Sequence, residues 1–395
     1  MKEFRSYIPT KIILSEDGQR KIGELVAPYA KKVLLVYGGQ SLKKSGTYDE
    51  IVDSLKECQI EYSELGGVLP NPKLSLVYEG IRRCREEKID FLLAAGGGSV
   101  IDTAKAIAAG VNYDSDVWDF FVGGKTPTSM LPVGVLLTIP AAGSEAGCAS
   151  VITKEETTEK RTLVSELAFP VFAVLNPKLC YTIPKNQIAA GGADIFAHVM
   201  ERYFEPTYEN PFSDRLCEAT MKTVLELLPK VLKNSRDYAS WANLMWAGSI
   251  AHNGILGAGR SEDWASHNIE HELSAEYDIA HGAGLAIVIP AWMRYVYTAQ
   301  PRRFLQFAQR VFDLTLPNEG EPDEHGKQET VILQAIDKLE EFFKSVGLAT
   351  KLEEAGIHSD RFEQMADRAT ANGVLGNFMT LDRTDVINIY QMALR

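Results

Sequence analysis

Residues 90–109 constrain the fold of this chain more than any other stretch. Residues 90–95 form an apolar run typical of a buried strand, residues 96–99 are Gly-Gly-Gly-Ser, and residues 100–109 are typical of a helix. A strand that passes through a glycine-rich turn directly into a helix is typical of a sheet covered by helices. Glycines let backbone N–H groups approach a phosphate, and the N-terminus of the next helix favours its negative charge. We therefore predict a pyrophosphate cradle here, although the turn is neither Gly-x-Gly-x-x-Gly nor a Walker motif and a tight turn without a ligand is the alternative.

Strands and helices alternate through the first half of the chain. Short apolar runs that end at turn residues predict buried strands, and apolar residues spaced three or four positions apart predict helices. Such alternation implies a mostly parallel sheet with helices on its faces. The further predicted strands are residues 32–37, 59–64, 133–139 and 171–175, and the further predicted helices are residues 48–57 and 74–88.

The second half of the chain, after Pro184, is predicted to be helical. The whole chain of 395 residues exceeds what one hydrophobic core usually holds, so two domains are expected. We predict an α/β cofactor-binding domain over residues 1–185 and an all-α domain over residues 186–395. The helices predicted in the second domain are residues 188–204, 212–233, 239–256, 262–276, 284–299, 302–313 and 330–346.

Composition and charge argue against several classes of protein. The net charge of −12 leaves no basic surplus to neutralise nucleic-acid phosphates. No apolar run approaches the roughly 18–20 residues of a membrane span, and the N-terminus lacks the apolar segment of a signal peptide. The five cysteines are scattered without a Cys-x-x-Cys pair, which favours neither a disulfide framework nor a thiolate zinc site. We expect a cytoplasmic protein, with an exposed acidic loop at residues 317–328.

The end of the predicted strand at residues 32–37 bears on the choice of cofactor. An acidic residue at this place in a dinucleotide site binds the ribose 2′-hydroxyl and repels a 2′-phosphate. Residues 38–44 are Gly-Gly-Gln-Ser-Leu-Lys-Lys, without an acid. Glycine amides, a hydroxyl and two lysines favour NADP over NAD, and an ordinary solvated turn is the alternative. The small and hydroxylated residues from Thr138 to Ser144 could line the same cofactor or could simply mark the exit of another strand.

Residues 264–289 contain His267, His271 and His281, out of seven histidines in the chain. His267 and His271 lie one helical turn apart, and Asp194 and His198 have the same spacing on an earlier predicted helix. Asp194 and His198, with His267 and His281 from the later segment, offer one carboxylate and three imidazoles, which suit Fe²⁺ or Zn²⁺. A surface hydrogen bond is the alternative for Asp194 and His198 taken alone, but their neighbours are apolar or small. We therefore predict a divalent-metal site in the second domain.

Four segments of the chain together resemble one protein family. Residues 93–105, 138–145, 191–202 and 264–289 are similar to the iron-containing (group III) alcohol dehydrogenases, most of all to the NADPH-dependent, butanol-dehydrogenase-like branch. The likeness runs over nearly the whole chain. It implies an α/β cofactor domain, an α-helical C-terminal domain and a metal in the cleft. It also implies a homodimer.

The resemblance further implies roles for individual residues. It implies that the metal ligands are Asp194, His198, His267 and His281, and that His271 lies beside the nicotinamide. It assigns the diphosphate contacts to Gly97, Gly98 and Ser99, the cofactor-lining positions to Asp102, Thr138, Ser144 and Lys160, and the ribose-phosphate end to Gly38, Gly39 and Ser41. One position departs from the family pattern: Ala142 stands where the family has threonine, so a hydroxyl that contacts the cofactor is missing.

These assignments predict a metal-dependent oxidoreductase that interconverts aldehydes and primary alcohols such as butanal and butanol with NADP(H). The metal would bind the substrate oxygen, and hydride would pass to or from nicotinamide C4. His271 would relay the proton, with a packing role as the alternative. Two other functions stay open: a polyol- or glycerol-type dehydrogenase or transhydrogenase on the same scaffold, and a non-catalytic protein that binds metal and nucleotide. No nucleic-acid or membrane partner is expected.

Overall fold

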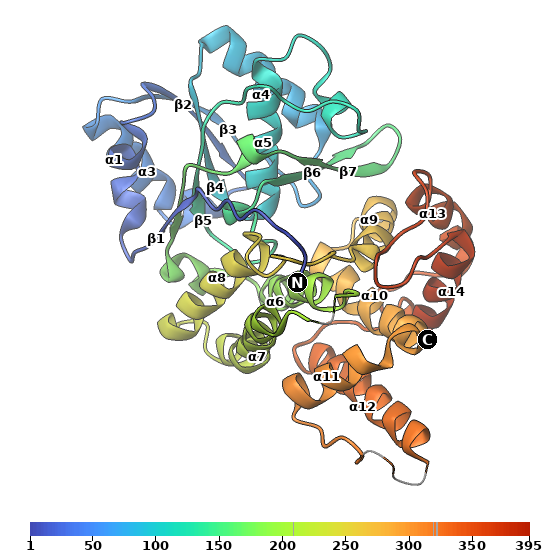
Figure 1. The fold of residues 1–395 in the computed structure, drawn as a ribbon. Helices are drawn as coiled ribbons and strands as arrows, with labels where there is room; N and C mark the ends of the chain where they lie inside the picture. Colours follow the sequence, from blue (N-terminus) through green and yellow to red (C-terminus); the bar gives the residue numbers. More distant parts are fainter. Residues whose placement is uncertain (208, 319, 321–322) are drawn as a thin grey trace. The chain divides into compact units, whose positions relative to one another are not determined.

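The computed structural model describes residues 1–207, 209–318, 320 and 323–395, and the chain forms two compact units, the α/β unit and the helical unit (Figure 1). The units differ from the predicted division at residue 185 in two segments. The first six residues belong to the helical unit, and helix α8 (Tyr238–His252) belongs to the α/β unit. The α/β unit consists of Tyr7–Ile183 and Asn234–Asn253, and the helical unit of Met1–Ser6, Pro184–Lys233 and Gly254–Arg395.

A six-stranded parallel sheet forms the centre of the α/β unit, in the order β1-β8-β5-β4-β2-β3. This confirms the predicted fold class of that unit. Strands β6 and β7 pair with each other as a separate antiparallel hairpin. The strands are β1 (Lys11–Leu14), β2 (Lys32–Tyr37), β3 (Glu61–Leu65), β4 (Phe91–Gly96), β5 (Val133–Leu137), β6 (Ala149–Lys154), β7 (Glu159–Val164) and β8 (Phe172–Leu175).

The sequence did not predict β1 or the β6–β7 hairpin. β1 has four residues, and its first and last side chains are exposed because the strand lies at an edge of the sheet. A strand this short contains too few residues to show an apolar period. The hairpin strands alternate buried and exposed side chains outside the main sheet, so they lack the continuous apolar run of a central strand.

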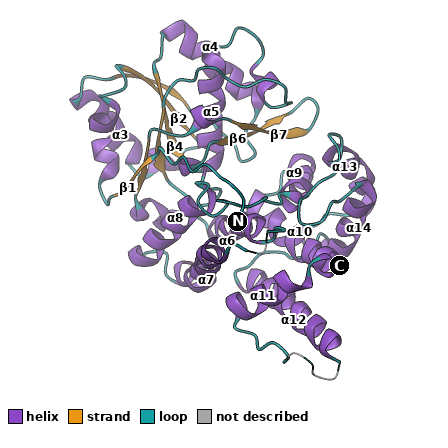
Figure 2. Cartoon of the chain, viewed as in Figure 1, coloured by secondary structure: helices purple, strands orange, loops and turns teal. Residues whose placement is uncertain are grey.

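Helices lie on both sides of the sheet (Figures 1 and 2). Helices α1 and α3 pack on the face that carries Val33, Leu35 and Phe91. Because side chains alternate along a strand, Leu34 and Val36 of β2 point to the other face, where α4 and α5 lie. The helices of this unit, besides α8, are α1 (Ile22–Val26), α2 (Ser41–Lys44), α3 (Thr47–Glu57), α4 (Leu74–Glu87) and α5 (Gly98–Val111).

The order of the strands along the chain changes direction between β2 and β4. β3 follows on one side of β2, whereas β4, β5 and β8 follow on the other side. In open parallel sheets, ligands bind outside the carboxyl ends of the strands at such a point. Gly38 and Gly39 come directly after β2, and Gly97 and Gly98 come directly after β4. Two glycine turns therefore flank the point where this fold usually holds a ligand.

The helical unit is built around α6, which packs against α7 and α10. Helix α9 packs against α10 and α13, and α14 also contacts α10. This confirms the predicted helical C-terminal domain. The helices of the unit are α6 (Lys185–Tyr203), α7 (Pro211–Lys233), α9 (Ala265–Tyr277), α10 (His281–Val296), α11 (Pro301–Phe312), α12 (Glu324–Ser345), α13 (Phe362–Ala369) and α14 (Arg383–Leu394).

Several predicted helix starts differ from the observed ones by three residues or more, and those of α10 and α12 bear on the site and on the predicted loop. Helix α10 begins at His281 rather than at residue 284. Gly282 and Gly284 lie inside the helix, where they allow neighbouring atoms to approach closely, and they do not interrupt it. A Cβ atom at Gly282 would lie 1.9 Å from the backbone oxygen of Ala190 on α6. Helix α12 begins at Glu324 and so includes part of the predicted acidic loop at residues 317–328; residues 319, 321 and 322 of that loop lie outside the described residues.

Two findings bear on the classes of protein considered above. Among the described residues, no helix combines the length and the apolar character needed to span a membrane. None of the five cysteines, all of them described, forms a disulfide: Cys58, Cys84, Cys148, Cys180 and Cys217.

Candidate functional site

Helix α6 carries a row of polar side chains through the interior of the helical unit. Asp194, His198 and Glu201 lie on one face of the helix, and all three are buried. Every residue of α6 from Ile188 to Tyr203 is buried, so the helix has no solvated side over this length. Buried polar groups are costly unless they bind a partner or a ligand. The row therefore marks a candidate binding site.

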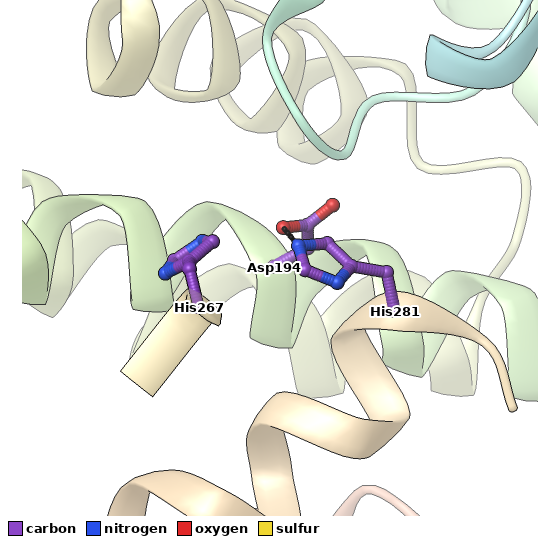
Figure 3. A group of neighbouring side chains, drawn as sticks. All are labelled: Asp194, His267 and His281. Atoms are coloured by element: carbon purple, nitrogen blue, oxygen red, sulfur yellow. Dashed lines mark ion pairs between the residues drawn. The ribbon is translucent and has the colours of Figure 1, made fainter. Parts of the chain in front are cut away.

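Two more helices bring histidines to this row: His267 lies on α9, and His281 is the first residue of α10. Asp194, His267 and His281 each offer a ligand atom, and these atoms lie within 4.8 Å of one another. Figure 3 shows the three side chains grouped together, each from a different helix. Nε2 of His281 is 3.9 Å from Oδ1 of Asp194, and the ring centroids of His267 and His281 are 5.2 Å apart. The structure thus brings together three of the four predicted metal ligands.

His198, the fourth predicted ligand, lies next to this group without being one of its three members. Its Nδ1 atom is 2.9 Å from the backbone oxygen of Asp194 and 3.0 Å from Oδ1 of the same residue. A carbonyl oxygen only accepts hydrogen bonds, so Nδ1 carries the proton and Nε2 is the nitrogen left for a metal. The ring centroid of His198 is 4.6 Å from that of His267.

The donor atoms of this group fit a divalent metal. Nε2 of His267 is buried and has no hydrogen-bond partner among the described residues. The buried Oδ1 of Asp194 also accepts no hydrogen bond there, because the Nδ1 proton of His198 goes to the backbone oxygen of Asp194. Burial, with the nearby rings of His198 and His281, lowers the pKa of His267 well below its usual value, so the ring is neutral at neutral pH. Burial alone would raise the pKa of Asp194, but the histidines, His198 first, lower it to about 2. A carboxylate and imidazoles are donors that Fe²⁺ and Zn²⁺ accept.

Two buried glutamates at this site were not among the predicted site residues. Oε1 of Glu201 is 2.6 Å from Nδ1 of His267, and a carboxylate oxygen of Glu270 contacts Nδ1 of His281. The sequence contains a signal for Glu201, because it continues the polar row of α6 at helical spacing. It contains none for Glu270, because nothing in the sequence links α9 to the start of α10.

His271 lies one turn after His267 on α9 and is half-buried. Its ring centroid is 5.3 Å from that of His281. With Glu270 and His281 it forms a second group whose ligand atoms lie within 4.8 Å of one another. His271 is therefore a neighbour of the metal group, and its contact with the nicotinamide stays a prediction.

The predicted phosphate turn joins the end of β4 to the start of α5. Gly97 precedes the helix, and Gly98 and Ser99 are its first two residues. A Cβ atom at Gly97 would lie 2.3 Å from Cγ2 of Ile139, whereas one at Gly98 would lie 3.4 Å from Cβ of Ala142. Packing therefore requires glycine at position 97 but not at position 98. The first amides of a helix have no partner within the helix, so this turn can bind an anion.

The predicted cofactor residues Asp102, on α5, and Ser144, in the loop before β6, form a hydrogen bond with each other. The hydroxyl of Ser144 donates to Oδ1 of Asp102 at 2.6 Å. Nζ of the buried Lys105 donates to the backbone oxygens of Ser144, Gly147 and Ala149 at 2.7, 2.8 and 3.0 Å. Burial lowers the pKa of Lys105 to about 8. These bonds fasten the loop before β6 to α5.

Thr138 and Lys160, also predicted to line the cofactor, lie on different elements of the α/β unit. Thr138 follows β5, and its N–H donates to the backbone oxygen of Gly96 at 3.0 Å, so it lies beside the end of β4. Lys160 on β7 is buried, and its Nζ donates to Oδ1 of Asn71 at 3.1 Å. Asn71 belongs to the loop after β3 and has a positive φ of 51°.

The residues predicted at the ribose end follow β2 directly: Gly38, Gly39 and Ser41. Ser41 is the first residue of the short helix α2. Nζ of Lys43 is 2.9 Å from a carboxylate oxygen of Glu64 on β3, whereas Lys44 is exposed. One of the two lysines predicted to favour NADP is therefore engaged by an acid.

Comparison with known proteins identifies the family of the chain. A model described as iron-containing alcohol dehydrogenase matches residues 9–177, and the C-terminal model of the same family matches residues 188–394. The chain is 43% identical over 395 residues to the probable NADH-dependent butanol dehydrogenase 1 of Bacillus subtilis (strain 168), with 100% of each chain covered. It is 37% identical to the NADPH-dependent aldehyde reductase YqhD of Escherichia coli (strain K12), with 95% of this chain and 94% of that protein covered.

The fold is also that of a solved structure. The crystal structure of NADH-dependent butanol dehydrogenase A from Thermotoga maritima superposes with a TM-score of 0.94 at 40% identity, covering 100% of this chain and 99% of that one. These matches confirm the resemblance to the iron-containing alcohol dehydrogenase family and the fold class predicted from the sequence, but not the NADPH-dependent branch. The chain belongs to the iron-containing alcohol dehydrogenase family.

Proposed function

We propose that this protein interconverts aldehydes and primary alcohols of the butanal and butanol type, with NADP(H) as the hydride carrier and a divalent metal in the helical unit. The observation that carries the proposal is the grouping of Asp194, His267 and His281, in which two buried atoms lack a hydrogen-bond partner within the described part of the chain. Relatives named butanol dehydrogenase and aldehyde reductase support the substrate class. Hydride transfer to or from nicotinamide C4 is the chemistry that the cofactor supplies.

The proposed metal ligands are Asp194, His198, His267 and His281. When bound, Fe²⁺ or Zn²⁺ supplies a Lewis acid that polarises a carbonyl group or lowers the pKa of an alcohol. Asp194 contributes one negative charge, and His267 is neutral. A donor set with a single negative charge cancels only half the charge of a divalent ion, which keeps the site attractive to oxygen atoms.

We assign the proton that accompanies hydride transfer to His271. Its half-buried ring lies beside His281 and is reached by solvent. An imidazole exchanges protons near neutral pH, so it can give a proton to the oxygen of the new alcohol in reduction and take it back in oxidation, directly or through water.

The proposed preference for NADP(H) rests on the end of β2. No acidic residue stands between Gly38 and Lys44, where NAD sites place an acid for the ribose 2′-hydroxyl. Lys43 is paired with Glu64, so the exposed Lys44 is the cation that we assign to the 2′-phosphate. The names of the relatives favour the other cofactor: four butanol dehydrogenases that are 38–43% identical to this chain are called NADH-dependent, whereas the NADPH-dependent aldehyde reductase YqhD is 37% identical.

Steady-state kinetics with butanal, NADPH and NADH test the proposal, together with metal analysis of the purified protein. We expect stoichiometric metal and a kcat/KM at least about tenfold higher with NADPH. Lys44→Ala should lower kcat/KM for NADPH about fivefold and leave NADH unaffected, because one charge contact to a phosphate contributes about 1 kcal/mol. Lys43→Ala is the matched control and should change neither. A preference for NADH would contradict the assignment at β2, and metal without nicotinamide oxidation would favour a binding protein.

We also propose a homodimer in the cytoplasm. β1 is an edge strand of the sheet, and its Leu14 side chain is 50% exposed. Unpaired strand edges are common places for a second chain to add. Free thiols at all five cysteines suit a reducing compartment. Light scattering on the purified chain measures the number of copies directly.

A further inference from the structure

We infer that Glu201 and Glu270 are positioning residues, which determine the ring nitrogen that His267 and His281 present to the metal. The inference rests on the proposed metal site. Each glutamate contacts Nδ1 of a histidine on another helix. Glu201 on α6 contacts His267 on α9, and Glu270 on α9 contacts His281 on α10. Both are buried, so water does not compete for their carboxylates.

Glu201 is surrounded by hydrogen-bond donors. The backbone N–H of Trp264 donates to its Oε2 at 2.6 Å, and the backbone N–H of His267 donates to its Oε1 at 3.2 Å. The hydroxyl of Ser266 also donates to Oε1. Both oxygens therefore act as acceptors, and Nδ1 of His267, 2.6 Å from Oε1, must carry a proton. Nε2 then keeps its lone pair, and it is the buried atom that has no partner among the described residues.

Glu270 does the same for His281 from a fully buried position. One carboxylate oxygen accepts from the hydroxyl of Ser274, and the other contacts Nδ1 of His281. Gly284 of α10 leaves the space for this carboxylate, because a Cβ atom there would lie 2.4 Å from its Oε1. Nε2 of His281 is on the side of Asp194 Oδ1, 3.9 Å away.

His198 shows the same arrangement with a neutral acceptor, since its Nδ1 faces the backbone oxygen of Asp194 at 2.9 Å. All three rings thus present Nε2, but only His267 and His281 are held by carboxylates. A carboxylate on the other ring nitrogen raises the basicity of the ligand and prevents the tautomer that would place a proton on the metal-binding nitrogen. Loss of either glutamate should therefore lower the affinity for the metal and leave the fold intact.

The affinity of the full-length apoprotein for Zn²⁺, measured by competition with a chelator, tests the inference. We expect Glu201→Gln and Glu270→Gln each to weaken Zn²⁺ binding roughly 10–100-fold, the usual effect of losing an outer partner of a ligand. The matched control is Glu272→Gln, because Glu272 is equally buried on α9 but pairs with Arg368 at 2.6 Å. We expect the control to change the affinity less than about threefold.

A second measurement separates positioning from a merely structural role. In ¹⁵N NMR spectra of the apoprotein with labelled histidine, the wild type should show His267 and His281 protonated at Nδ1, and each Gln variant should lose this state at one ring only. Gly284→Ala should imitate Glu270→Gln without changing the carboxylate, because the added methyl displaces it. Thermal unfolding of each apoprotein identifies a variant that fails to fold, and the other variants then carry the test.

The outcomes distinguish this inference from the proposed function. A wild type that binds no Zn²⁺ would overturn the proposed metal site itself. A wild type that binds Zn²⁺, with both Gln variants within threefold of Glu272→Gln and unchanged ¹⁵N spectra, would overturn the role of the two glutamates and leave the metal site standing.

Discussion

The metal group of the helical unit and the residues beside the phosphate turn of the α/β unit satisfy their polar atoms in opposite ways. In the helical unit, Oδ1 of Asp194 and Nε2 of His267 are buried and lack a hydrogen-bond partner in the part of the chain that the structure describes. In the α/β unit, Nζ of Lys105 has three backbone oxygens within 3.0 Å, and Asp102 accepts a hydrogen bond from Ser144. One group of residues needs a ligand to be complete, and the other is complete by itself.

This difference explains why a metal site is easier to recognise than a phosphate site when neither ligand is bound. A metal site must keep donor atoms unpaired, and each unpaired buried group costs about 1–3 kcal/mol. Such a cost is hard to explain without a ligand. A phosphate site uses backbone N–H groups at a helix N-terminus, which water satisfies when the ligand is absent. The turn before α5 therefore has a suitable shape for a phosphate but no hydrogen-bonding group that is left unsatisfied without one.

The largest effect should follow from removing a donor atom of the metal group. We expect Asp194→Ala or His267→Ala to lower metal affinity more than about 100-fold, beyond the loss of an outer partner, and to abolish turnover. The helices should remain, because Glu201 keeps its hydrogen bonds from Trp264 and Ser266 when His267 is replaced. When Asp194 is replaced, the backbone oxygen at position 194 still accepts from Nδ1 of His198. Metal analysis, circular dichroism and butanal reduction check this. Stoichiometric metal with retained activity in either variant would remove that residue from the site.

His271→Ala should have the next largest effect, on rate rather than on metal. We expect the variant to keep its metal and to lose roughly 10²–10⁴-fold in kcat, the usual contribution of a positioned acid or base. The pH dependence of kcat should lose one limb. His358→Ala, at an exposed histidine, is the control. An unchanged pH–rate profile would exclude His271 from the proton path and leave a packing role beside His281.

The glycines before α5 test whether the other unit binds the diphosphate. Gly98→Ala should raise the dissociation constant of NADPH about tenfold without lowering the melting temperature, because a Cβ atom there meets only Ala142 at 3.4 Å. Gly97→Ala is the contrasting variant. Its Cβ atom would lie 2.3 Å from Ile139, so it should lower stability by about 1–3 kcal/mol as overpacking does. Unchanged NADPH binding by Gly98→Ala would place the phosphates elsewhere.

The sequence predicted what depends on residues close together in the chain. The buried runs of β2 and β4 and the long helices have strong periods, so their type was predicted correctly, and most of their ends within a few residues, with the start of α12 as the exception. Asp194 and His198 were found because both lie on one helix. The four residues of β1 could not be recognised, because its pairing with β8 joins segments about 160 residues apart. Glu270 was missed for a different reason: its partner His281 is only 11 residues away, but the contact depends on how α9 and α10 pack, which no helical spacing shows.

The smallest effect should come from restoring a hydroxyl at position 142. The family pattern has threonine there, and the Ala142 side chain lies next to the position of Gly98 in the phosphate turn. One added neutral hydrogen bond contributes about 0.5–1.5 kcal/mol, so Ala142→Thr should tighten NADPH binding about two- to tenfold. Ala142→Val has the same shape without the hydroxyl and should give no such gain.

Titration calorimetry of both variants with NADPH distinguishes the possible results. Equal tightening by Thr and Val would assign the gain to packing, and no change in either would show that the hydroxyl does not reach the cofactor. The affinity for Zn²⁺ should stay constant throughout, because position 142 lies in the α/β unit and every proposed ligand lies in the helical unit. A change in metal affinity would therefore contradict the proposal that the α/β unit binds the cofactor and the helical unit binds the metal.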